Sequence, residues 1–184
     1  QVADAHFSSS LSAIQKGTRL PSSKSWAGIF DTLRDVNYFL EKNVNCDEAT
    51  REKYNGVAYF FRAMIYFEMV RQFGDMPYYD KVLGSTDTKE LTKPRDPRGY
   101  VMMKVLEDCD RAYERLPKDW GSDSQYRLSK DAALALKSRA ALFEGTFRKY
   151  HAGTEYLPVD EQVFDGVTVS SEWFLRQAAD AAAL

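Results

Sequence analysis

Residues 54–78 read YNGVAYFFRAMIYFEMVRQFGDMPY, and a helical projection of this segment places apolar side chains on nearly every side. A helix of that kind has to be surrounded by other elements, because no face of it suits water. We therefore predict a central, buried helix over residues 47–73. Gly74 ends it, and Pro77 prevents its continuation because proline lacks a backbone N–H. Gly74, Asp75 and Pro77 are accordingly assigned structural roles.

The segments that flank this helix also show helical spacing. Apolar residues recur with that period over residues 26–43, at Trp26, Ile29, Phe30, Leu33, Val36 and Leu40. Residues 81–93 are polar and without period, which predicts a long surface connection. Asp96 followed by Pro97 then predicts a helix start, with Asp96 as the capping side chain, and Pro117 ends that helix.

The last third of the chain contains two further predicted helices. Ser129 is a capping residue for a helix that is rich in small residues, which would let a neighbouring helix approach closely. An irregular segment with a short strand at residues 164–169 follows, and a fifth helix starts at Ser170 or Ser171. Helix pairs separated by long irregular inserts favour an all-α, tetratricopeptide-like α-α superhelix.

The length of the chain is that of one domain. We expect residues 1–184 to form a single helical domain. The sequence opens with Gln1 rather than Met and stops at Leu184 inside an alanine-rich stretch, so we expect a truncated part of a longer protein. Its longest apolar run, residues 57–67, contains Arg62 and is far shorter than the roughly 18 residues that a membrane-spanning helix needs.

Charged residues are balanced and well mixed along the sequence. There are 25 lysines and arginines and 27 aspartates and glutamates, which give a net charge of -2. Without a basic block, neither nucleic acid nor an anionic membrane surface is indicated as a partner. Cys46 and Cys109, the sole cysteines, form no CxxC motif and show no metal-ligand spacing with histidine. We therefore predict no metal site and no cofactor.

Four blocks of sequence, taken in order, form a pattern. The first contains Trp26, Ile29 and Asn37, and the second is the central segment quoted above. The third is VLEDCDRA at 105–112, which follows Arg95, and the fourth is YRLSKDAA at 126–133. Together these blocks resemble the SusD/RagB family, whose central helix reads GEAxFLRAxxYFxLVxxYGDVP.

This resemblance implies a lipoprotein on the outer face of a Gram-negative outer membrane, in a Bacteroidetes-type bacterium. Such a protein binds an oligosaccharide or a similar nutrient and caps a SusC-like TonB-dependent transporter. The resemblance also implies that the lipid-bearing cysteine lies outside this sequence, so that the membrane is reached only through that anchor. Because family members are much longer, the resemblance implies that this sequence covers only the helical-repeat part of such a protein.

A catalytic constellation is not found in the sequence. His6 and His151 are the only histidines and belong to no metalloprotease motif, and there is neither a nucleophile elbow nor a phosphate-binding loop. Asp108 and Asp110 could serve as paired carboxylates of a glycosidase. Two residues apart on a helix, they point away from each other, so we interpret both as solvated surface residues. We predict a protein that is not an enzyme.

Loop aromatics are the candidates for glycan contacts, because sugar rings have apolar C–H faces that stack on flat side chains. Trp120, Tyr78 and Tyr79 are the predicted ligand-binding residues, although packing over helix ends is the competing interpretation. Arg62 interrupts an apolar helix, and we favour an ion pair with a neighbouring helix over an anion site. For Asn37 we expect a structural hydrogen bond.

Two other functions stay open at this point. A helical-repeat adaptor would bind proteins through its concave face and would have no affinity for a soluble glycan. A fragment of an all-helical glycoside hydrolase would need a second inward carboxylate and measurable sugar release.

Overall fold

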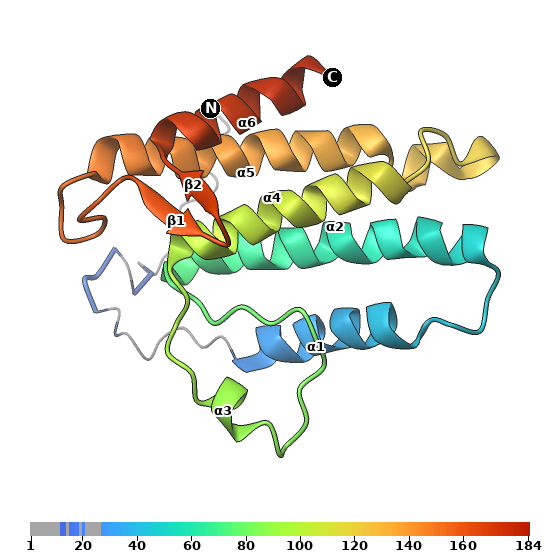
Figure 1. Ribbon diagram of the computed structural model, residues 1–184, viewed down its shortest axis with the longest axis horizontal. Coiled ribbons are helices and arrows are strands. Elements are labelled where there is room, and N and C mark those ends of the chain that lie inside the picture. The colour runs from blue at the N-terminus through green and yellow to red at the C-terminus, as the bar shows by residue number, and fades with distance from the viewer. Residues whose placement is uncertain (1–11, 14, 19, 21–26) are drawn as a thin grey trace.

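The computed structural model describes residues 12–13, 15–18, 20 and 27–184, with the side chains of 27 and 123–125 excepted. The long helices of the described part are α1 (Ala27–Lys42), α2 (Glu48–Phe73), α4 (Arg98–Arg115), α5 (Lys130–His151) and α6 (Ser171–Ala183). Each packs on the long helix before it and the one after it, and neighbours run in opposite directions (Figure 1). The prediction of an all-α superhelix of helix pairs is confirmed. Trp26 and His6 lie outside the described residues.

Helix α2 occupies the interior position that its sequence predicts, between α1 and α4 (Figure 1). The Asp47 side chain caps its start by accepting the Thr50 backbone N–H at 2.9 Å. Gly74 ends it with a φ of 73°, a conformation that glycine adopts without steric cost. Burial is complete at Tyr66, whereas Phe61 is 40% exposed because α1 covers only part of α2. The prediction of a buried helix is therefore wrong for the Phe61 side.

The start of α4 differs from the prediction. Asp96 does not cap the helix, which begins at Arg98 with Pro97 in the capping position and no side-chain hydrogen bond there. The Asp75 carboxylate instead accepts the Arg98 backbone N–H at 2.9 Å. The Asp96 carboxylate turns back and accepts the Tyr78 backbone N–H at 2.7 Å. The capping group comes from a residue far along the chain, which local sequence does not reveal.

Small residues allow the close helix packing that the sequence predicts. A Cβ added to Gly145 of α5 would lie 2.8 Å from the Leu175 Cγ of α6. One added to Gly56 of α2 would lie 3.0 Å from the backbone that follows α4. The predicted helix starts are also confirmed, since the Ser129 side chain caps α5 and the Ser170 side chain caps α6.

The segment between α5 and α6 contains a hairpin instead of one strand. Strands β1 (Gln162–Phe164) and β2 (Val167–Val169) pair antiparallel. Asp165 and Gly166 form the turn, with φ values of 50° and 82°. An Asp-Gly pair between two short apolar runs is the sequence signal for such a turn, so this hairpin was predictable.

The connection between α2 and α4 lies at the surface over residues 81–93, as predicted, because none of these residues is buried, but it is not irregular throughout. It contains the short helix α3 (Thr88–Leu91) and runs past α1 before it returns to α4 (Figure 1). The Tyr79 hydroxyl donates to the Glu90 carbonyl at 3.0 Å, which ties the two arms of the connection together. The connection thereby forms a wall beside α1.

A 3-10 helix, η3 (Gly121–Tyr126), separates α4 from α5. Both cysteines are free thiols, Cys46 exposed and Cys109 buried. Within the described residues, no helix combines the length and the apolarity that crossing a bilayer requires.

Candidate ligand-binding groove

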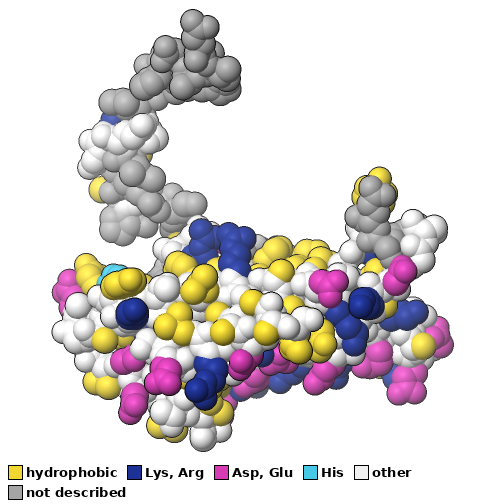
Figure 2. Space-filling model, turned by 90° about the horizontal axis from the view of Figure 1, so that it is seen from above, with side chains coloured by type: hydrophobic (Ala, Val, Ile, Leu, Met, Phe, Trp, Pro, Cys, Tyr) yellow, Lys and Arg dark blue, Asp and Glu magenta, His cyan; other side chains and the backbone are white. Residues whose placement is uncertain are grey.

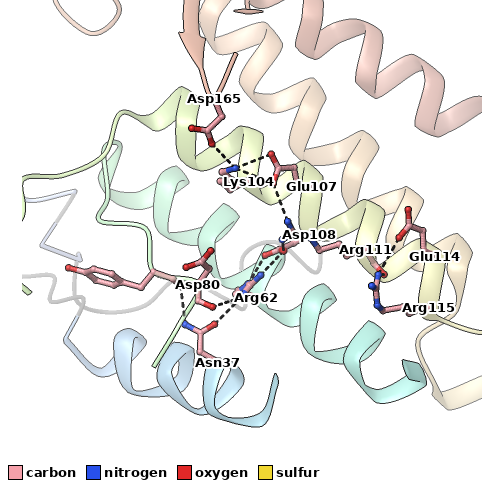
Figure 3. A network of polar contacts seen from close by, with 11 residues as sticks. Asn37, Arg62, Asp80, Lys104, Glu107, Asp108, Arg111, Glu114, Arg115 and Asp165 are labelled. Atoms are coloured by element: carbon pink, nitrogen blue, oxygen red, sulfur yellow. Dashed lines mark hydrogen bonds and ion pairs between the residues drawn. The ribbon is translucent and has the colours of Figure 1, made fainter. Parts of the chain in front are cut away.

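Arg62 lies at the centre of a buried polar network that joins α1, α2 and α4 (Figure 3). Its Nε and Nη2 donate to the two carboxylate oxygens of Asp108, at 2.7 and 2.8 Å. Its Nη1 donates to the Asn37 side-chain oxygen at 3.0 Å and to the Asp80 carbonyl at 3.2 Å. Burial by itself lowers the pKa of Arg62, but the hydrogen bonds and charge of Asp108 outweigh it and raise that pKa. The guanidinium is therefore charged and paired on every side.

The same network holds the backbone of residues 79–81. Asn37 Nδ2 donates to the Tyr79 carbonyl at 3.0 Å and to the Lys81 carbonyl at 3.3 Å. The Tyr66 hydroxyl accepts the Tyr79 backbone N–H at 2.6 Å and donates to the Tyr79 carbonyl at 3.1 Å. Together with Arg62, these side chains fix the segment against α1 and α2.

Asp108 and Asp110 have different surroundings, although they are two residues apart on α4. Asp108 is 0% exposed and belongs to the Arg62 ion pair. The Asp110 side chain is 50% exposed and accepts a hydrogen bond from Lys137 of α5 at 2.7 Å. The two carboxylates point apart as predicted, but the prediction that both are solvated is wrong for Asp108. Its side of α4 is the side that packs on α2.

A second buried network, which the sequence analysis missed, joins α4 and α5 to the hairpin. The Glu144 carboxylate accepts from Arg98 Nη2 at 2.7 Å and from Arg148 Nε at 3.0 Å. Arg148 also donates to the Asp160 carbonyl at 2.6 Å and to the Gln162 side chain at 2.8 Å. Burial lowers the pKa of Arg148, and the charge of Glu144 opposes that shift. The four-residue spacing of Glu144 and Arg148 was the available signal, but it predicts contact and not burial.

Tyr78 is not available to a ligand. It is 6% exposed, and its ring centroid lies 4.7 Å from that of Tyr66 and 6.0 Å from that of Tyr100. Within the described structure its hydroxyl is buried without a hydrogen-bond partner, and burial raises its pKa above the ordinary value. The prediction that Tyr78 contacts a ligand is therefore wrong. Consecutive residues of an extended segment point to opposite sides, so Tyr78 faces inward and Tyr79 outward.

Tyr79 lines an open groove between α1 and the α2–α4 connection. The groove has a volume of about 560 Å³, within the range of small-molecule sites. Its lining combines apolar and charged side chains, including Phe30, Asp31 and Arg34 of α1 and Tyr79, Lys81 and Lys93 of the connection. Because the fixed segment 79–81 forms one wall, the groove exists before a ligand arrives.

The Tyr79 ring is half-buried in this groove. Its centroid lies 5.7 Å from that of Phe30, and Lys93 Nζ lies 5.0 Å from it. Burial raises the pKa of Tyr79 above its ordinary value. A ligand in the groove can therefore meet an aromatic ring and an ammonium group together.

Trp120 lies elsewhere in the molecule. Its Nε1 donates to the Leu128 carbonyl at 2.6 Å, and its ring centroid lies 6.1 Å from that of Tyr54 at the start of α2. Tyr66 binds the Tyr79 backbone. Tyr54 lies twelve residues before Tyr66 on the same helix, which is a distance of about 18 Å along the helix axis. The structure thus does not bring Trp120 and Tyr79 together, and half-buried Trp120 covers the end of the α2–α4 pair.

The remaining residues with assigned structural roles lie where α2 leads into the groove wall. Gly74 turns the chain, and Asp75 caps α4. Met76 and Asp96 then pair through two backbone hydrogen bonds of 3.1 and 3.2 Å. Pro77 follows and lines the groove. This short paired segment sets the direction in which the wall leaves α2.

The buried carboxylates of α4 and α5 are bound by arginine side chains and lie away from the groove. Among the residues that the structure describes, no group of three or more His, Cys, Asp or Glu residues is arranged to hold a metal ion. Asp108 and Glu144, both fully buried, are each bound to arginine side chains. Neither carboxylate opens into the groove lining.

Comparison with known proteins points to one family. Residues 4–142 match the SusD-like family described as starch-binding and associating with the outer membrane. The sequence is similar to SusD-like protein P2 of Formosa agariphila, with 30% identity over 126 residues, or 66% of this chain and 24% of that protein. The structure is similar to that of a SusD-like protein from Bacteroides fragilis, with a TM-score of 0.62, 35% identity and coverage of 66% of this chain and 24% of that one.

A laminarin-binding SusD-like protein is similar in fold alone. It has a TM-score of 0.59 at 20% identity, over 76% of this chain and 32% of that one. The chain spans about a quarter of the length of the two relatives named before it.

Proposed function

The chain belongs to the SusD-like family, and on that basis we propose that it is the helical part of a longer protein that binds a glycan at the cell surface. The matched part of this chain covers only 24% of SusD-like protein P2, which supports the proposal that it acts as one part of a longer protein. The protein delivers the bound glycan, or a similar nutrient, to a SusC-like TonB-dependent transporter. It sits on the outer face of the outer membrane and is held there by a lipid anchor outside this sequence.

The preformed groove beside Tyr79 is the observation that carries the binding role. Its wall is held by buried hydrogen bonds from Asn37 and Arg62 to the carbonyls of residues 79–81. Ligand binding there costs little conformational entropy of the protein, because the wall needs no rearrangement. Tyr79 is the proposed ring contact in the groove, and Trp120 is proposed as a separate contact at the other end of α2.

Binding proceeds without bond chemistry in this proposal. Glycoside hydrolysis needs two carboxylates that flank the scissile bond. The buried carboxylates of α4 and α5 form ion pairs with arginine, Asp108 with Arg62 and Glu144 with Arg98. This arrangement favours a binding role over the hydrolase alternative. The helical stack supplies a rigid scaffold and the surface that faces the transporter.

A binding titration tests the proposal. The purified chain is titrated calorimetrically with neutral and acidic hexasaccharides, and its migration is measured in native gels that contain laminarin or soluble starch. We expect at least one glycan to bind, and Tyr79→Ala to weaken that binding by about tenfold, as the loss of one aromatic contact of about 1.4 kcal/mol does.

Controls separate this site from the rest of the surface. Tyr150→Ala, which removes a 72% exposed ring on α5, should leave affinity unchanged. Circular dichroism shows whether each variant is folded. Absence of binding to every glycan would refute the proposal in favour of a protein-binding adaptor, and release of reducing sugar would refute the non-catalytic role.

A further inference from the structure

The groove beside Tyr79 gathers positive charge. Four cations line it, those of Arg34, Lys81, Lys93 and Arg95, against the single lining carboxylate of Asp31. On the face shown in Figure 2, by contrast, acidic and basic side chains lie interspersed. Like charges repel when they are brought together, and clefts lined by one sign of charge attract ligands of the opposite sign. The lining therefore indicates a negatively charged ligand.

Carboxylates of the chain neutralise only part of this charge. Lys93 Nζ lies 2.7 Å from an Asp96 carboxylate oxygen, and Lys81 Nζ lies 3.8 Å from one of Glu90. Arg34 is exposed, and it has no ion pair in the part of the chain that the structure describes. Its guanidinium is available to a ligand.

The backbone that carries Lys81 and the ammonium group of Lys93 are held in place before a ligand arrives. Asn37 binds the Lys81 carbonyl at 3.3 Å, and the Lys93 ammonium donates to the Tyr78 carbonyl at 2.9 Å. Arg34 lies on α1 about one turn before Asn37, on the same helix face. A charged group that enters meets cations whose backbone is already fixed, which lowers the entropic cost of binding.

The groove also offers the two kinds of contact that a charged sugar needs. The Tyr79 ring can meet the apolar face or edge of a sugar, and Lys93 Nζ lies 5.0 Å from the centroid of that ring. A planar guanidinium such as that of Arg34 binds two oxygens of a carboxylate or a sulfate at once. Both contacts lie in one volume of about 560 Å³, which is large enough for a short oligosaccharide segment.

We propose that this groove prefers glycans that carry negative charge, as carboxylates or sulfate esters, with Arg34 and Lys81 contacting the charged group and Tyr79 the sugar ring. The inference rests on the proposed glycan binding and names the class of glycan that the site selects. Carboxylate and sulfate share the chemistry that the site recognises, and the experiment separates them.

The test compares hexasaccharides of one length and different charge. The chain is titrated calorimetrically with a laminarin hexamer as the neutral probe, a galacturonate hexamer as the carboxylate probe and a carrageenan hexamer as the sulfate probe. We expect at least one charged probe to bind about tenfold more tightly than the neutral one at about 50 mM NaCl, and most of that preference to disappear at about 500 mM. Whichever charged probe binds more tightly identifies the group.

Matched variants locate the effect. Arg34→Gln and Lys81→Gln should each weaken the charged probe about fivefold and leave the neutral probe unchanged. Arg176→Gln, which removes an exposed cation on α6, should leave both unchanged. The inference is overturned if the neutral hexamer binds as tightly as both charged ones, or if Arg34→Gln and Lys81→Gln behave like Arg176→Gln.

The failures of the two proposals are distinguishable. Binding of the neutral probe without a charge preference overturns the charged-ligand inference and leaves glycan binding standing. No binding of any probe at either salt concentration overturns both.

Discussion

Asp108→Asn should destabilise the fold far more than Asp110→Asn, although the two aspartates lie two residues apart on α4. Asp108 accepts two hydrogen bonds from the buried Arg62 guanidinium. Two unit charges about 4 Å apart attract by about 4 kcal/mol at an effective dielectric constant of 20. The asparagine side chain of the variant is uncharged, so it removes that attraction and leaves Arg62 charged in the core. We therefore expect the free energy of unfolding to fall by about 3–5 kcal/mol. The Asp110 pair with Lys137 is half-exposed, and its loss should cost about 0.5 kcal/mol.

Urea unfolding followed by circular dichroism measures both changes. The double variant Arg62→Met/Asp108→Leu adds a second readout, because it removes both charges and leaves no uncompensated ion in the core. We expect the double variant to be more stable than Asp108→Asn, while the Asn37 side chain and the Asp80 carbonyl lose one donor each. Equal midpoints for Asp108→Asn and Asp110→Asn would show that the Arg62 pair is not the buried anchor that its geometry indicates.

Three further outcomes are expected from single positions. Tyr78→Phe should stabilise the chain by about 1 kcal/mol in the same assay, because it removes a buried hydroxyl without a partner in the described structure; a loss of stability would contradict this. Gly145→Ala should cost about 1–3 kcal/mol through its clash with α6, whereas Gly28→Ala, with open space around it, should cost nothing; equal effects would refute the close packing. Ellman's reagent should react with Cys46 alone in the native chain and with Cys109 only in denaturant, because burial shields the Cys109 thiol and raises its pKa. Rapid reaction of both thiols in the native chain would be inconsistent with the fold.

The helices were predictable because their signals are local. Apolar spacing predicted α2 over 47–73, and the structure has it at Glu48–Phe73. The caps at Ser129 and Ser170 also act within three residues of their own position. Asp96 shows where this reasoning fails. Its position before Pro97 suits a cap, but the Asp75 carboxylate reaches the same helix start from the preceding connection.

The candidate site could be predicted only in part. Tyr79 was identified as a loop aromatic, but nothing in the sequence separated it from Tyr78, whose side chain the extended backbone turns into the core. The groove itself combines α1 with a connection that begins after α2. Contacts between segments so far apart in sequence leave no periodic signal in either of them.

The sequence by itself determined the all-α architecture, the helix ends set by serine caps and the family to which the chain belongs, because periodicity, capping and ordered motifs are written in neighbouring residues. The tertiary structure alone decided which charges are buried and which side chains share a groove. Asp108 and Asp110 have the same chemistry and nearly the same position, yet one faces α2 and the other lies beside α5 at the surface. The cost of burying a charge depends on the partner that packing supplies, and that partner is Arg62 on another helix.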